Sequence, residues 1–447
     1  MESFAARQIM PGENGSQIVF IKSRSIFVRA ALVVSMLLAL WLAWYAFSRE
    51  IGNMMAEITA PTAVNAKATA RAALWMAPSD PFVNWLLATT ENDAFIPEKA
   101  AASVRNFEKL VQLAPNDYRW WIELGRAREQ GEDIAGGEKA FRRSVELAPS
   151  YAYPRWQLGN FYLRQGRNDE AFAEMKLAAQ DSPLYREQVF YTVWDFFNQD
   201  KEQLERIVGN SPQVRATLAK FYASHGQPDA ALRTWNSLTP EEKEEHRPIG
   251  LLMMQQLHEK KHFRASLSFV REMGWEPQAE MEKIQNGGFE SPVRPEVPKA
   301  VYFDWNVADK DKFTVRQDQA QKHEGKSSLR LNFNSVNVPT FAGVSQIVAV
   351  EPGVSYSLTF WLRTENLKSA GPPQVEVAGI NDGRTFGSTP QFATGTNDWQ
   401  QMRIDFTVPA DTDGIVVRTV RYCGENCPLV GIVWYDEFNL QKISGGK

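Results

Sequence analysis

Two histidines spaced four residues apart are the first residues in this chain that could do chemistry. His258 and His262 share one face if their segment is helical, and imidazole is a common ligand of transition metals. The run reads His258-Glu259-Lys260-Lys261-His262 and is not the H-E-x-x-H motif of metalloproteases. Because the two central lysines oppose cation binding, we do not expect a metal ion here.

Motifs for nucleophilic or nucleotide chemistry are absent from the sequence. It contains no G-x-S-x-G elbow, no P-loop and no G-x-G-x-x-G that opens a helix. The paired carboxylates of a glycoside hydrolase need only be close in space, so the sequence leaves that chemistry open. We expect a binding protein and not an enzyme, with a glycan-modifying enzyme as the least favoured alternative.

The two cysteines stand close together near a turn, in Cys423-Gly424-Glu425-Asn426-Cys427. A four-ligand zinc site needs more Cys or His residues nearby, and none is close in sequence. We expect a short-range disulfide if this end of the chain lies in an oxidising compartment. Two ordinary thiols are the alternative.

The size and charge of the chain limit the number of domains and the classes of partner that we expect. A chain of 447 residues with 44% hydrophobic and 23% charged residues should fold into two or three domains. The formal net charge of −4 is small for this length and comes without a Lys/Arg-rich block. It therefore gives no electrostatic reason to expect nucleic acid as a partner.

Residues 26–47 form the most apolar stretch of the chain, and 30–47 carry no charge. A helix of that length spans about 33 Å, close to the ~30 Å hydrocarbon core of a bilayer. The stretch is longer than the apolar part of a cleaved signal peptide, and it ends in the bulky run 44–47 with no small-residue cleavage signature after it. Trp41, Trp44 and Tyr45 cluster at one end, as in an aromatic belt. We expect an uncleaved signal anchor that crosses the membrane once.

The charges beside this segment predict its orientation. Basic residues precede the helix at Arg7, Lys22, Arg24 and Arg29. Because positive residues stay in the cytoplasm, residues 1–25 should be cytoplasmic and the rest extracytoplasmic. In a bacterium this places the chain in the inner membrane with its bulk in the periplasm.

A repeat of 34 residues dominates residues 50–275. Prolines stand at 81, 115, 149 and 183, and Leu124-Gly125 recurs as Leu158-Gly159. The run WIELG at 121–125, the run LGNFYLRQGRNDEAF at 158–172 and the prolines that close each unit resemble the tetratricopeptide repeat. The resemblance implies a solenoid of helical hairpins whose concave surface receives a protein partner. Trp120 is our candidate for that groove, and a plain spacer is the alternative role.

Helical periodicity gives way to strand alternation after residue 285. Runs with apolar residues at every second position cover 328–333, 355–362 and 401–408, and Gly- or Pro-containing turns separate them. Many short strands without helices predict a β-sandwich over 285–443. The fold class is thus multidomain: one transmembrane helix, an all-α solenoid and an all-β sandwich.

Five segments in order carry a second resemblance: NGGFE (286–290), HEGKSSLRL (323–331), PGVSYSLTFWLR (352–363), NDWQQMRIDFTV (397–408) and VWYDEFNL (433–440). They are similar to galactose-binding-like jelly-roll carbohydrate-binding modules. The resemblance implies glycan binding on aromatic platforms. It places Trp361 and Trp399 in the core, and we favour Trp305, Phe341 and Phe386 as platform residues. It also implies a structural calcium ion held by Glu290 and Asp436, for which plain turn or surface carboxylates are the alternative.

Together these features predict a membrane-anchored extracytoplasmic scaffold. Its repeats would bind protein partners and its sandwich would bind glycan, in the assembly or export of cell-envelope polysaccharide. The alternative is an envelope protein-assembly factor whose β domain binds protein, since this fold is also used for protein contacts.

Overall fold

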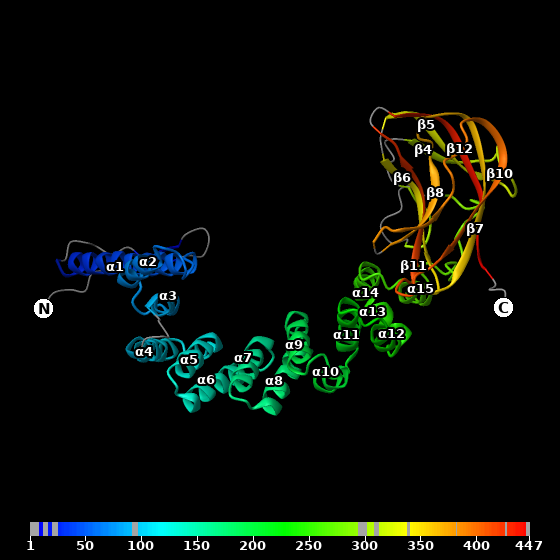
Figure 1. Ribbon diagram of the computed structural model, residues 1–447. Coiled ribbons are helices and arrows are strands. Elements are labelled where there is room, and N and C mark those ends of the chain that lie inside the picture. Colours follow the sequence, from blue (N-terminus) through cyan, green and yellow to red (C-terminus); the bar gives the residue numbers. More distant parts are fainter. Residues whose placement is uncertain are drawn as a thin grey trace. The chain divides into compact units, whose positions relative to one another are not determined.

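A computed structural model describes residues 9–11, 17–19, 26–91, 97–293, 302–307, 313–337, 340–380, 382–424 and 427–443 (Figure 1). The chain divides into two compact units, Met1–Tyr185 and Arg186–Lys447, which are described separately.

The first unit is mainly helical. Two short strands near the N-terminus, β1 (Ile9–Pro11) and β2 (Gln17–Val19), pair antiparallel. The helices that follow are α1 (Ile26–Glu57), α2 (Ala66–Met76), α3 (Pro81–Glu91), α4 (Pro97–Leu113), α5 (Tyr118–Gln130), α6 (Ile134–Leu147), α7 (Ala152–Arg164) and α8 (Asn168–Asp181).

Helix α1 contains the apolar segment predicted to span a membrane. Within the described residues it is the one helix long and apolar enough to do so. It continues past the predicted end at residue 47, and its last turns pack against α2 and α3. Gly52 permits this contact, because a Cβ atom at this position would lie 2.7 Å from the Cβ of Ala77.

Helical hairpins follow, as the 34-residue period predicts. Helix α5 packs on α6 and α7 packs on α8. Gly125 and Gly159 occupy equivalent positions, where a Cβ atom would lie 3.0 Å from the Phe141 ring and 2.9 Å from the Met175 side chain. The repeated glycines therefore let the two helices of each hairpin approach closely.

The second unit joins the last helices to the sandwich. Its helices are α9 (Pro183–Phe196, which begins in the first unit), α10 (Lys201–Val208), α11 (Pro212–Ser224), α12 (Pro228–Asn236), α13 (Pro240–Glu245), α14 (Arg247–Glu259) and α15 (Phe263–Glu272). Helices α11 and α12 pair, as do α14 and α15. The last of these helices ends at Glu272.

Two five-stranded antiparallel sheets form the sandwich (Figure 1). We call β3-β6-β11-β8-β9 the front sheet and β10-β7-β12-β5-β4 the back sheet. The strands are β3 (Asn306–Val307), β4 (Phe313–Asp318), β5 (Ser328–Asn337), β6 (Thr340–Ala349), β7 (Ser355–Lys368), β8 (Gln374–Gly379), β9 (Thr385–Ser388), β10 (Gly395–Thr407), β11 (Gly414–Tyr422) and β12 (Pro428–Lys442).

Strict alternation along the strands builds the core between the sheets. In β7, Tyr356, Leu358 and Phe360 are buried while the residues between them are partly exposed. The same alternation places Ile415 and Val417 of β11 in the core. This confirms the jelly-roll sandwich predicted from the period of two.

Helix α15 is docked on one end of the sandwich. Asp413, just before β11, accepts hydrogen bonds from the N–H groups of Phe263 and Arg264 at 3.3 and 3.2 Å and so caps the helix. The Phe263 ring packs against Gly414 so closely that a Cβ atom there would lie 2.3 Å from it. The last hairpin and the sandwich therefore belong to one compact unit.

Candidate carbohydrate-binding face

An exposed aromatic ring stands at the end of strand β11 on the outer face of the front sheet. The Tyr422 side chain is 52% exposed. Arg418 lies four residues earlier on the same strand, so it faces the same side, and Glu376 of β8 is paired with Arg418 in register. Alternation and register thus gather Tyr422, Arg418 and Glu376 on one surface.

Hydrogen bonds orient these three side chains. The Glu376 carboxylate is 1% exposed and accepts from Arg418 Nε at 2.6 Å and from the Tyr422 hydroxyl at 3.3 Å. The Thr385 hydroxyl donates to the same carboxylate at 3.2 Å. Burial is the main cause that raises the pKa of Tyr422, and the negative charge of Glu376 raises it further. The phenol is therefore a neutral hydrogen-bonding group at physiological pH, and its ring faces solvent.

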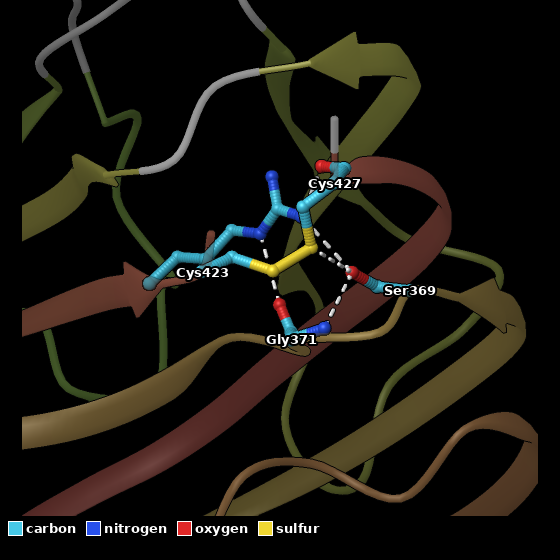
Figure 2. Close-up of a disulfide and its surroundings, with 5 residues drawn as sticks. Ser369, Gly371, Cys423 and Cys427 are labelled. Atoms are coloured by element: carbon cyan, nitrogen blue, oxygen red, sulfur yellow. Dashed lines mark hydrogen bonds between the residues drawn. A yellow bond between two sulfur atoms is a disulfide. The ribbon is translucent and has the colours of Figure 1, made fainter. Parts of the chain in front are cut away.

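A disulfide fixes the chain beyond Tyr422. Figure 2 shows the bond between Cys423 and Cys427, whose Cα atoms lie 6.2 Å apart. The wholly buried Arg421 side chain donates to the Gly371 carbonyl at 2.9 Å, to the Ser369 hydroxyl at 3.0 Å and to the Cys427 carbonyl. The strand end that carries Tyr422 is thus held on both sides.

Two of the platform residues predicted from the sequence lie on the same sheet. Phe341 is in β6, opposite Arg421 in register, and its side chain lies outside the described part of the chain. Phe386, in β9, is half-buried: it packs against the core, and the Arg384 guanidinium lies 5.7 Å from its ring centroid. Phe386 can therefore offer only part of its ring to a ligand.

Trp305, the third predicted platform residue, is in the core. It is 6% exposed and packs against Phe289 and Phe438, with ring centroids 5.2 and 5.1 Å away. Its indole N–H donates to the Asn286 carbonyl at 3.2 Å. The prediction was wrong because Trp305 directly precedes the edge strand β3, where the sequence does not reveal which way the ring turns.

The assignment of Trp361 and Trp399 to the core was also wrong. Both are half-buried on the outer face of the back sheet. Trp361 faces outward because it alternates along β7 with the inward-facing Phe360. The His323 ring stacks on Trp361 at 3.7 Å and meets Trp399 edge-on at 5.9 Å. His323 therefore covers one face of Trp361.

The two carboxylates predicted to bind calcium hold one loop, 323–327. Glu290 accepts from the N–H of Lys326 at 2.8 Å, and Asp436 accepts from the N–H of His323 at 2.8 Å. Both lie beside Gly288, within about 4 Å of where its Cβ would be. Carboxylate oxygens are ligands that calcium prefers. These oxygens also accept hydrogen bonds from the loop, so calcium binding stays a prediction.

Trp120, predicted to line the groove of the repeats, is buried. It is 4% exposed and packs against Phe82 and Trp85, with centroids 5.3 and 6.4 Å away. The neighbouring Trp121 is half-buried and donates its indole N–H to the Pro115 carbonyl at 2.8 Å. Adjacent residues of a helix point in directions about 100° apart, and the sequence did not show which of the two rings faces inward.

Tyr422 was missed by the sequence reasoning. The signal that could have found it is the alternation in VVRTVRY at 416–422, in which Val417 and Thr419 face inward and Arg418 faces outward. Extended to the end of the strand, the pattern places Tyr422 outside.

Comparison with known proteins agrees with this architecture. Residues 282–420 match the family model described as "Carbohydrate binding domain", which confirms the predicted resemblance for the sandwich. No curated protein matches the chain.

Three similar solved structures illustrate the likeness. The one titled "CBM4 structure and function" is 15% identical, covers 36% of this chain and 99% of its own, and gives a TM-score of 0.27. TmCBM61, solved in complex with beta-1,4-galactotriose, is 20% identical over 37% of this chain and all of its own, with a TM-score of 0.26. A structure of MamA is 16% identical over 41% of this chain and 90% of its own, with a TM-score of 0.24.

Proposed function

We propose that this protein is a membrane-anchored extracytoplasmic scaffold whose β-sandwich binds glycan on the front sheet, around Tyr422. Its helical repeats hold protein partners, and it acts in the assembly or export of cell-envelope polysaccharide. The observation that carries the proposal is an exposed tyrosine with a fixed hydroxyl, on a domain that matches a carbohydrate-binding family.

The chemistry of the front sheet suits sugars. The C–H faces of a sugar ring pack on an aromatic ring, and its hydroxyls need hydrogen-bond partners placed around that ring. The Tyr422 ring offers the C–H contact. Arg418 and Thr385 lie beside it and donate to Glu376, so the Thr385 hydroxyl oxygen can accept from a sugar and only the remaining N–H groups of Arg418 can donate to one. Glu376 is engaged by these neighbours, so its role is to hold them and not to act as a catalytic base. This favours a binding site over an enzyme.

The anchor is helix α1 in this proposal. Its apolar part spans the bilayer, with residues 1–25 in the cytoplasm and the repeats and sandwich outside. A disulfide between Cys423 and Cys427 is consistent with an oxidising compartment.

The test is glycan binding by the full-length protein in detergent micelles, screened on an array of envelope polysaccharides. Tyr422→Ala should lower the affinity for the bound glycan at least tenfold, which corresponds to about 1.4 kcal/mol. Tyr191→Ala is the matched control, since Tyr191 is 47% exposed and lies in the helices.

No binding to any glycan, or equal loss in both variants, would reject the proposal. Capture of a protein partner that depends on Tyr422 would then favour the protein-assembly alternative.

Calcium at Glu290 and Asp436 is a separate part of the proposal. The ion would neutralise the two carboxylates and hold the 323–327 loop in place. A chelator should then lower the melting temperature of the wild-type protein, and a Glu290→Gln variant should not respond. An unchanged wild-type melting temperature would mean that the hydrogen bonds of the loop are sufficient.

A further inference from the structure

Tyrosines of the first unit recur near the start of three helices, α5, α7 and α9. Tyr118 begins α5, Tyr151 directly precedes α7, and Tyr185 lies in the first turn of α9. Tyr151 and Tyr185 are 34 residues apart, which is the period of the repeat, and Tyr118 lies 33 residues before Tyr151, one position out of that register. Because the units of a solenoid stack side by side, residues near the same end of the first helix in successive units lie along one surface.

The rings along this surface form two groups of contacts. The Tyr118 and Tyr151 centroids are 5.5 Å apart. Tyr153 and Trp156, in the first turns of α7, contact Tyr185 with centroids 6.2 and 5.9 Å away. We call these five residues the aromatic row.

The aromatic row is accessible. Tyr151 is 60% exposed, and the other four side chains are half-buried. The row borders an open hollow of about 600 Å³, whose lining residues are Ala114, Pro115, Asn116, Asp117, Tyr118, Arg119 and Tyr151. One end of the row thus adjoins a space large enough for a ligand.

The charges beside the row are balanced within the protein. Three arginines lie next to these rings, and each is paired with a carboxylate: Arg119 with Asp117, Arg126 with Glu123 and Arg155 with Glu174. Arg126 also donates to the Tyr153 hydroxyl at 3.0 Å. Since these cations already have partners, the row suits a neutral ligand better than an anionic peptide or an acidic sugar.

Two phenols of the row, those of Tyr118 and Tyr185, are neutral hydrogen-bonding groups. Burial raises the pKa of Tyr118 and of Tyr185, and the other tyrosines of the row raise it further. At neutral pH these two residues therefore present apolar ring faces with hydroxyl groups at their edges.

We propose that the aromatic row is a second glycan-binding surface, which holds a neutral segment of the polysaccharide that the sandwich binds. Ring faces and hydroxyl edges are the groups that recognise sugars, and the same chain carries a domain that matches a carbohydrate-binding family. This inference rests on the proposed function for the identity of the polymer. The row occupies only the first turns of three helices, which leaves other repeat surfaces for protein partners.

The experiment measures the affinity of the full-length protein in detergent for soluble β-glucan, xylan and galactan. Binding is compared in the wild type, Tyr422→Ala, Tyr151→Ala and the double variant. In the Tyr422→Ala background, residual binding should remain and should fall about tenfold when Tyr151→Ala is added, which corresponds to about 1.4 kcal/mol. Tyr151→Phe keeps the ring and should retain most of that binding. Nitration of Tyr151 by tetranitromethane should also slow when the polysaccharide is bound.

The outcomes separate the two proposals. If Tyr422→Ala abolishes all binding and Tyr151→Ala binds like the wild type, the inference about the row is wrong and the sandwich site stands. If Tyr151 is required and Tyr422 is not, the row stands and the sandwich site fails. Aromatic grooves also bind proline-rich peptides. Tyr151-dependent binding of polyproline without any glycan binding would therefore replace the glycan at the row with a peptide.

Discussion

Replacing Phe263 should uncouple the last helical hairpin from the sandwich within the second unit. The Phe263 side chain is 1% exposed, lies against Gly414 of β11 and meets the His258 ring at 5.3 Å. Truncating a buried phenylalanine to alanine costs about 3–5 kcal/mol. A domain of roughly 150–250 residues loses about 2–4 °C of melting temperature per kcal/mol. Phe263→Ala should therefore lower the melting temperature of the second unit by about 6–20 °C.

Amide hydrogen exchange of the full-length protein shows where the stability is lost. If the docking couples both parts, Phe263→Ala should increase exchange in α15 and also in β11, the strand that begins at Gly414. Phe263→Leu keeps an apolar side chain of similar volume and should cost less than about 1.5 kcal/mol.

The reasoning would be refuted if exchange rose in α15 alone while β11 kept its wild-type protection. The sandwich would then be stable without the last hairpin. An equally large loss in Phe263→Leu would instead mean that the shape of the ring, and not the burial of apolar area, sets the contact.

Three further predictions concern the disulfide, a helix contact and pH. Cys423→Ser should cost about 2 kcal/mol, from the loop-closure relation for a five-residue loop, and reductant should lower the wild-type melting temperature but not that of the variant. Gly159→Ala should cost about 1–3 kcal/mol in denaturant unfolding, because the new methyl would lie 2.9 Å from a methionine side chain of α8. Gly424→Ala, where a Cβ meets nothing within 4 Å, should change stability little. Hydrogen bonds, chiefly from Arg167, lower the pKa of Glu138 from 4.5 to about 2. This stabilisation is present above about pH 5 and is lost as the pH falls through the folded pKa, so Glu138→Gln should flatten the melting temperature between about pH 5 and pH 3.

The helices and strands were predicted well because their packing imposes a regular spacing of residue types on the sequence. The recurrence of glycine at 125 and 159 indicated that two helices approach each other closely there. In the structure each of these glycines lies against a large side chain of the paired helix. The alternation in 355–362 predicted a half-buried strand, and strand β7 includes these residues. Such patterns come from neighbours in the chain or in the next repeat, so the sequence alone can contain them.

Individual aromatic side chains were predicted less well. Trp120 and Trp305 were chosen for possible exposure and are buried, whereas Trp361 and Trp399 were assigned to the core and are half-buried. An aromatic ring suits either environment, so the residue type does not decide between them. The direction of the strand or helix decides, and it is ambiguous at edges such as Trp305 before β3. Tyr422 shows the converse, since an unbroken alternating run would have placed it outside.

The docking of α15 could not be predicted, because Asp413 and Phe263 are 150 residues apart in the chain. It has a consequence for how two ligands could be held. Strand β11 begins at the docked end, with Gly414, and ends at Tyr422. At about 3.3 Å per residue, eight steps along the strand separate these ends by about 26 Å. A glycan on Tyr422 would therefore lie well away from the α15 contact, and a protein partner bound at the last hairpin would not compete with it. Because Asp413 and Phe263 join the hairpin firmly to the sandwich, both ligands would be held in a fixed relation within one compact unit.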